Sequence, residues 1–117
     1  LYFIMANIQL RRLRNIWIQK EFLLEFNMLN ILENLIKLAR DRKSSPIEGS
    51  YTNKLLADKS LSKAKVLEEV DELIKAVEEN SNKIHEAADV FYHLLMYLEA
   101  NDIKIEEVMS ELEKRKK

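Results

Sequence analysis

The sequence predicts an all-α fold. One glycine and one proline among 117 residues leave very little turn punctuation, and both lie in a single segment, SSPIEGSYTN. Apolar residues recur at helical spacing in the rest of the chain. The length suits one domain of ordinary size and is too short for two. We therefore expect about four helices with one long connecting loop.

The first expected helix starts the regular part of the chain at Met28. Leu32, Leu35 and Ala39 continue its apolar stripe, and basic residues lie at its end, where cations suit the helix dipole. The helix should end near Lys43, because a residue that precedes proline is biased out of helical geometry.

The remaining elements follow from caps and turns. After the loop, which we expect to reach about residue 53, either Ser60 or Ser62 could cap a second helix that runs to about residue 80. The third helix is expected over residues 81–100, with Ser81 and Asn82 as caps. A turn at residues 101–102 then leads to a last amphipathic helix that carries Ile105, Val108, Met109 and Leu112.

Residues 1–27 differ from the domain expected over residues 28–117. They are bulky and basic, and their first residues resemble the remnant of a cloning tag. We interpret them as an N-terminal extension that packs as an opportunistic helix. The alternative is a basic amphipathic helix that lies on a membrane or a partner.

Composition narrows the classes of function. Apolar residues make up 47% of the chain and charged residues 33%, with a net charge of −1. No basic field points to nucleic acid or anionic lipid, and no apolar run is long enough to span a membrane. The absence of cysteine rules out disulfides and thiolate metal sites and fits a cytoplasmic setting.

The second helix gathers carboxylates opposite its apolar side chains. Glu68, Glu69 and Glu72 project into one arc, where like charges repel one another. Lys65 and Lys75 flank this cluster, so a solvated charged surface is one interpretation of the helix. The apolar residues that define its other face are Val66, Val70, Leu73, Ile74 and Val77.

The sequence of the third helix argues against the interpretation of these carboxylates as a solvated charged surface. In HEAADVFYHLLMYL, only one narrow strip is polar, and Glu86, Asp89 and His93 lie on it. Buried carboxylates need a cation, either Lys or Arg from another helix or a divalent metal shared with the second helix. Carboxylates without cysteine favour Mg²⁺ or Mn²⁺ over Zn²⁺. Mg²⁺ held in this way keeps positions open for phosphate oxygens, which indicates phosphoanhydride hydrolysis. His93 is either a hydrogen-bonded packing residue or a functional group.

These residues resemble a known family. Glu68-Glu69-x-x-Glu72, followed by Glu86-x-x-Asp89, is similar to the signature of the all-α, MazG-like nucleoside triphosphate pyrophosphohydrolases. More narrowly, SYTNKLL, KVLEEVDE, EAADVFYHLL and EEVMSELEKR resemble segments of the phosphoribosyl-ATP pyrophosphohydrolases of histidine biosynthesis. The resemblance covers about residues 28–115. It implies a helical bundle that cleaves phosphoribosyl-ATP to phosphoribosyl-AMP and pyrophosphate with Mg²⁺.

The resemblance also assigns roles to particular residues. It implies a metal site at Glu68, Glu69, Glu72, Glu86 and Asp89, with Glu68 or Glu69 positioning or deprotonating the attacking water. It implies substrate contacts, some of them on a mobile loop that closes over the ligand, from Ser50, Tyr51, Thr52, Lys54 and Lys65. The functional alternative for His93, from its place on the polar strip of the third helix, is a further substrate contact.

The expected assembly is a homodimer. Proteins of this kind are usually dimers, and the third helix is apolar around almost its whole circumference, more than a chain this short can cover by itself. Two alternatives remain: a house-cleaning hydrolase of non-standard nucleoside triphosphates, and a non-catalytic helical dimerisation or adaptor module.

Overall fold

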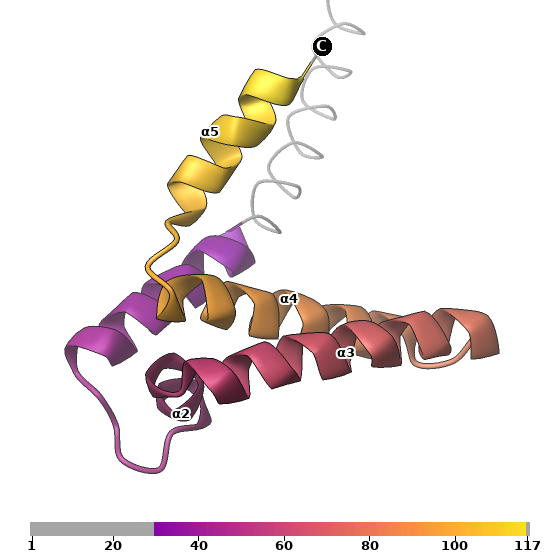
Figure 1. Ribbon diagram of the computed structural model, residues 1–117, viewed down its shortest axis with the longest axis horizontal. Helices are drawn as coiled ribbons and strands as arrows, with labels where there is room; N and C mark the ends of the chain where they lie inside the picture. Colours follow the sequence, from indigo (N-terminus) through magenta and orange to yellow (C-terminus); the bar gives the residue numbers. More distant parts are fainter. Residues whose placement is uncertain (1–29, 117) are drawn as a thin grey trace, which may run out of the picture. The chain divides into compact units, whose positions relative to one another are not determined.

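The computed structural model describes residues 30–116, which form helices joined by short connections (Figure 1). Residue 30 is already helical, and this helix runs through residue 44. No strand occurs within residues 30–116, which confirms the predicted all-α class. The helices that follow are α2 (Tyr51–Ala57), α3 (Lys59–Glu79), α4 (Lys83–Ala100) and α5 (Ile105–Arg115).

The chain divides into two compact units, Leu1–Asn34 and Leu35–Lys117, and the description below concerns the second unit. The predicted extension of residues 1–27 lies outside the described residues. Among those described, no helix is both long and apolar enough to cross a membrane.

The segment that begins at Tyr51 is a helix, and the prediction of a loop there was wrong. The side chain of Ser50 accepts a hydrogen bond from the backbone N–H of Asn53 and caps α2. Leu55 is completely buried, so α2 is anchored by its apolar side. The candidate substrate residues at 51–54 therefore stand on a packed helix.

α3 begins earlier than predicted. Its N-cap is Asp58, whose Oδ1 accepts a hydrogen bond of 3.0 Å from the backbone N–H of Leu61. Neither Ser60 nor Ser62 is the cap, because both lie inside the helix. Asp58 also ends α2, so α2 and α3 are separated by one residue.

α3 and α4 form an antiparallel hairpin (Figure 1). Asn80 takes a left-handed conformation, with φ of 53°, and the N–H of Ser81 donates to the Ala76 carbonyl at 3.0 Å, the pattern of a Schellman motif. Of the two predicted capping residues, Asn82 occupies the N-cap position of α4 and Ser81 does not. Asn82 precedes α4, but its backbone is also left-handed and its side chain makes no capping bond, since capping requires extended geometry.

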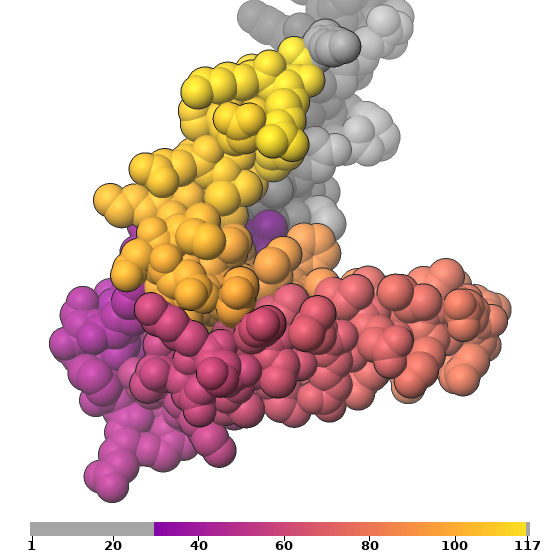
Figure 2. Space-filling view, in the orientation of Figure 1, coloured from indigo at the N-terminus to yellow at the C-terminus, as the bar shows by residue number. Residues whose placement is uncertain are grey.

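The face of α3 that turns inward carries small and acidic side chains. Ser62, Glu69 and Ala76 are its buried residues, spaced by seven positions. Its large apolar side chains are more exposed, including Leu67 at 64% and Val77 at 58%. α3 lies along the face shown in Figure 2. The exposed fractions place Leu67 and Val77 on the surface of the described chain.

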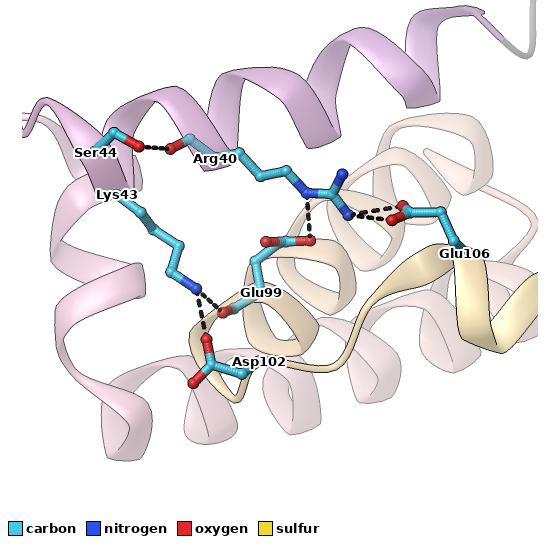
Figure 3. A network of polar contacts seen from close by, with 6 residues as sticks. All are labelled: Arg40, Lys43, Ser44, Glu99, Asp102 and Glu106. Carbon is cyan, nitrogen blue, oxygen red and sulfur yellow. Dashed lines mark hydrogen bonds and ion pairs between the residues drawn. The ribbon is translucent and has the colours of Figure 1, made fainter.

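Ion pairs tie the helix of residues 30–44 to the end of α4 and the start of α5 (Figure 3). Arg40 donates to the buried carboxylate of Glu99 at 3.3 Å and to Glu106 at 2.7 Å. Lys43 donates to the backbone carbonyl of Glu99 at 2.7 Å and to Asp102 at 2.9 Å. Asp102 is the left-handed residue of the predicted 101–102 turn, which is confirmed. These contacts fix the C-terminal end of α4, far along the helix from Glu86 and Asp89 near its start.

Candidate metal centre

Three carboxylates from α3 and α4 meet between the two helices. One oxygen from each of Glu69, Glu72 and Glu86 lies within 4.8 Å of the others. Only 8% of Glu69 is exposed, and its Oε2 accepts no hydrogen bond from any described residue. Oε2 of Glu86 is likewise buried and unpartnered within residues 30–116. Because a buried carboxylate oxygen without a donor costs free energy, this group favours a bound cation.

No Lys or Arg of the described chain supplies that cation. The two lysines that flank the group are paired elsewhere, Lys65 with Glu68 and Lys75 with Asp71. Within residues 30–116, none of the three central carboxylates forms an ion pair. The alternative of a structural salt bridge at this group therefore has no support from the residues that the structure describes.

The electrostatics agree with a shared acidic site. Burial, and then the negative charge of Glu72, raise the pKa of Glu69 above its ordinary value. Burial and the neighbouring carboxylate of Glu72 raise the pKa of Glu86 in the same direction. These directions are those expected for carboxylates held together at low solvent exposure. A divalent cation would relieve the repulsion and satisfy the unpartnered oxygens.

The donor set fits a hard cation. The central group offers only carboxylate oxygens, which Mg²⁺ and Mn²⁺ prefer. Asp89 extends it, because oxygens of Glu86 and Asp89 lie within 4.8 Å of each other and of an imidazole nitrogen of His85. His85 is largely exposed, and its Nε2 lies 3.4 Å from Oδ2 of Asp89.

Glu68 stands apart from the other predicted ligands. Its carboxylate is 50% exposed and lies 3.1 Å from the ammonium of Lys65. It belongs to neither group of close ligand atoms. The structure therefore brings together Glu69, Glu72 and Glu86, joins Asp89 to Glu86, and leaves Glu68 on the outer side of α3.

Hydroxyl and imidazole groups connect α2 to α4 beside the acids. The Tyr51 hydroxyl lies 2.9 Å from Nε2 of His93, and Oγ1 of Thr52 lies 2.6 Å from the Tyr92 hydroxyl. Thr52 and His93 are buried, whereas 45% of Tyr51 is exposed. Of these residues, Tyr51 is the one whose side chain is most open to a ligand.

The segment before α2 forms an open depression of about 810 Å³, a size that suits a small-molecule ligand. Ser50, Tyr51 and Lys54 lie in its wall. Lys54 is exposed and therefore available to a phosphate. Oγ of Ser50 already accepts hydrogen bonds from Asn53 and from the guanidinium of Arg42, so it can offer a ligand mainly its O–H.

Sequence reasoning missed several residues around the site. Asn53 joins three segments, since its amide donates to the Arg42 carbonyl at 2.7 Å and accepts from the N–H of Ile47 at 2.9 Å. The only sequence feature that could have indicated this role is weak: Asn53 follows the capping Ser50 by three residues. His85, at i and i+4 with Asp89, had a clearer signal in its helical spacing.

The comparisons with known proteins agree with the resemblance. The family described as phosphoribosyl-ATP pyrophosphohydrolase matches residues 32–116. A protein of Clostridium acetobutylicum named phosphoribosyl-ATP pyrophosphatase is 44% identical over 89 residues, which cover 73% of this chain and 80% of that protein. One of the same name from Methanococcoides burtonii is 38% identical over 93 residues, covering 75% and 94% of the two chains.

A longer relative shares the same region. A histidine biosynthesis bifunctional protein of Pyrococcus furiosus is 43% identical over 90 residues, which cover 76% of this chain but 43% of that protein. The match to the shorter relatives spans most of both chains, and the family match covers more than half of this one. The chain belongs to the phosphoribosyl-ATP pyrophosphohydrolase family.

Proposed function

We propose that this protein hydrolyses phosphoribosyl-ATP to phosphoribosyl-AMP and pyrophosphate in histidine biosynthesis. The observation that carries the proposal is the group of Glu69, Glu72 and Glu86 in a member of this family: one carboxylate oxygen of each lies within 4.8 Å of the others, and Glu69 and Glu86 each have a buried oxygen without a partner among the described residues. Water attacks the α,β-phosphoanhydride, the anhydride bond breaks, and pyrophosphate leaves with the bonding electrons.

Mg²⁺, or Mn²⁺ in its place, is the proposed cofactor. Glu69, Glu72, Glu86 and Asp89 would hold it, because their oxygens converge and their donor type suits a hard cation. When bound, the metal would neutralise phosphate charge and make a coordinated water more acidic.

Glu68 is the member of the Glu68/Glu69 pair that we assign to the attacking water, because Glu69 is assigned to the metal. Its carboxylate lies outside the convergent group and is open to solvent, whereas Glu69 is buried among the proposed ligands. The Glu68 carboxylate lies 3.1 Å from the Lys65 ammonium, which would hold it in one orientation. Of the pair predicted to include the residue that activates water, we therefore propose Glu69 as a metal ligand and Glu68 as the base.

The nucleotide is proposed to bind along α2 and the depression before it. Ser50 and Tyr51 offer hydroxyl groups at its wall, and Lys54 offers a positive charge. Lys65 would meet phosphate charge from α3. Thr52 is buried against Tyr92, so its contribution is to hold α2 in place.

We further propose that the protein works as a cytoplasmic homodimer. α3 and α4 expose large apolar side chains, among them Leu67, Ile84 and Phe91, with 55% to 88% of their surfaces accessible. Such a surface on two neighbouring helices favours burial against a second copy. The net charge of −1 gives no reason to expect nucleic acid as a partner.

The decisive experiment incubates the purified chain with phosphoribosyl-ATP, with Mg²⁺ or with EDTA, and resolves the products by ion-exchange chromatography. We expect phosphoribosyl-AMP and pyrophosphate only with metal, and their loss in Glu69→Gln. Glu78→Gln is the matched control, because Glu78 is exposed on the same helix and belongs to no ligand group.

Two other outcomes would replace the proposal. Intact phosphoribosyl-ATP beside hydrolysis of a non-standard nucleoside triphosphate would indicate a house-cleaning hydrolase with the same site. No hydrolysis of any nucleotide, together with no effect of Mg²⁺ on the melting temperature, would indicate a helical adaptor module.

A further inference from the structure

His93 uses both of its ring nitrogens inside the protein. Nδ1 lies 2.7 Å from the backbone oxygen of Asp89, and Nε2 lies 2.9 Å from the hydroxyl of Tyr51. A backbone carbonyl can only accept a hydrogen bond, so Nδ1 must carry a proton. In a neutral imidazole the other nitrogen is then an acceptor, and the Tyr51 hydroxyl must donate to it.

The surroundings hold this arrangement in place. His93 is 6% exposed, and its ring stands edge-on to the rings of Tyr51 and Tyr92 at centroid distances of 5.9 Å and 5.1 Å. Burial raises the pKa of the Tyr51 phenol, which keeps its proton available for donation. With both nitrogens occupied and the ring buried, His93 has no polar atom left for a ligand.

We propose that His93 is a positioning residue that makes Tyr51 donate its hydroxyl proton inward, so that the Tyr51 oxygen can only accept a hydrogen bond from the substrate. This proposal deepens the proposed function and rests on it. It differs from the prediction that His93 touches the substrate itself.

As a consequence, different residues of the binding site contact different parts of the substrate. Phosphate oxygens are acceptors, so an acceptor-only Tyr51 gives them no hydrogen bond. A ribose hydroxyl or the amino group of the base can donate to it. Tyr51 therefore recognises the nucleoside part of the substrate, and the lysines serve the phosphates.

The first test is the protonation pattern of His93 in the full-length protein. A long-range ¹H–¹⁵N NMR spectrum distinguishes the protonated from the unprotonated ring nitrogen. The chain has two histidines, so the signals of His93 are those lost in His93→Phe. We expect a proton on Nδ1 and none on Nε2, and Tyr51→Phe should shift the Nε2 resonance. A proton on Nε2 would overturn the proposal.

The second test compares two ligands by isothermal titration calorimetry in the presence of Mg²⁺. Tyr51→Phe should weaken phosphoribosyl-AMP by about 3- to 10-fold, the range that one hydrogen bond provides, and should leave pyrophosphate binding within about twofold. Tyr97→Phe is the matched control, because the Tyr97 hydroxyl makes no hydrogen bond to any described residue of α2 or α4. Equal weakening of both ligands would refute the assignment.

Variants of His93 separate positioning from packing. His93→Phe keeps an aromatic ring but removes the acceptor, so the Tyr51 proton is no longer held inward. Phosphoribosyl-AMP should then bind more weakly than to the wild type, but no more weakly than to Tyr51→Phe, which removes the oxygen itself. The double variant should bind no more weakly than Tyr51→Phe, because both substitutions act through one hydrogen bond. His93→Gln, whose amide oxygen can accept from Tyr51, should restore part of the affinity; additive losses would contradict the proposal.

Failure of the proposed function is recognised separately. If the wild-type protein does not hydrolyse phosphoribosyl-ATP, the function is wrong, whereas the NMR result still decides whether His93 directs the Tyr51 proton. If hydrolysis occurs but the two ligands respond alike to Tyr51→Phe, the function stands and the role of His93 is wrong.

Discussion

Replacing Glu69 by Gln should stabilise the metal-free protein. In EDTA, Glu69 places a buried charge beside Glu72 and Glu86, and its Oε2 has no donor among the described residues. The Gln amide has nearly the same shape, carries no charge and can donate to a neighbouring carboxylate. Removing an unsatisfied buried acceptor contributes about 1–3 kcal/mol, and relief of like-charge repulsion adds a few tenths of a kcal/mol.

The gain corresponds to a measurable change in melting temperature. For a domain of this size, 1 kcal/mol shifts Tm by about 4–8 °C, so the variant should melt several degrees higher than the wild type in EDTA. With Mg²⁺ at about 100 times its Kd, the wild type should gain about 2.7 kcal/mol of stability. Glu69→Gln should gain much less, because it has lost a ligand. The difference in Tm between Glu69→Gln and the wild type should therefore become smaller or change sign when metal is added.

The stability of the metal-free protein should also depend on pH, which tests the same prediction independently. The pKa of Glu69 is raised in the folded state above the ordinary value of 4.5. Between the unfolded and the folded pKa, the folded state binds more protons, so stability in EDTA is fully present below about pH 4.5 and falls as pH rises through the folded pKa. Glu69→Gln should lack this fall.

Differential scanning calorimetry of both proteins, in EDTA and in Mg²⁺ and between pH 4 and pH 8, measures all of these quantities, and Glu78→Gln serves as the control on the same helix. A lower Tm for Glu69→Gln in EDTA would refute the reasoning, because it would mean that the carboxylate has a stabilising partner. An unchanged response to Mg²⁺ would show that Glu69 is not a ligand.

Three further predictions concern the scaffold and the assembly. Arg40→Ala should lower the free energy of unfolding in urea by about 1–3 kcal/mol, because its buried carboxylate partner on α4 loses a cation, whereas Arg115→Ala breaks an exposed pair and should cost at most about 0.5 kcal/mol. Asp58→Ala should cost about 0.5–2 kcal/mol as the cap of α3, and Ser60→Ala much less, so an equal cost would contradict the observed helix start. Phe91→Glu should convert the proposed dimer to a monomer in light scattering after gel filtration; a dimer of unchanged stability would place the interface elsewhere.

The helices were predictable because few residues in this chain can stop one. The end of the first described helix before Pro46, the turn at residues 101–102 and the last helix at Ile105–Arg115 were all predicted from local signals. Local signals failed where two caps competed. Asp58 and Ser60 are both good capping residues, and the choice between them depends on the packing of α2, which buries Leu55. No short-range pattern encodes that packing.

The orientation of α3 about its axis could not be predicted from the sequence. Periodicity separates its apolar residues from its glutamates but does not say which side faces α4. In the described chain, the acidic side faces inward at Glu69, while Leu67 and Val77 stay exposed. A helix packed by hydrophobicity alone would do the reverse. This orientation of α3 is favourable if a cation compensates the acids on its inner side and a second copy of the chain covers the apolar residues on its outer side.

This arrangement links the proposed metal site physically to the proposed dimer interface. If the apolar side of α3 forms the dimer interface, the interface fixes the rotation of α3 about its own axis, and that rotation determines how closely Glu69 and Glu72 approach Glu86 on α4. Weakening the dimer should therefore weaken Mg²⁺ binding even though no ligand has been changed. Measuring Mg²⁺ affinity in Phe91→Glu tests this coupling. A monomer that binds Mg²⁺ with wild-type affinity would show that the α3–α4 hairpin alone holds the carboxylates in place.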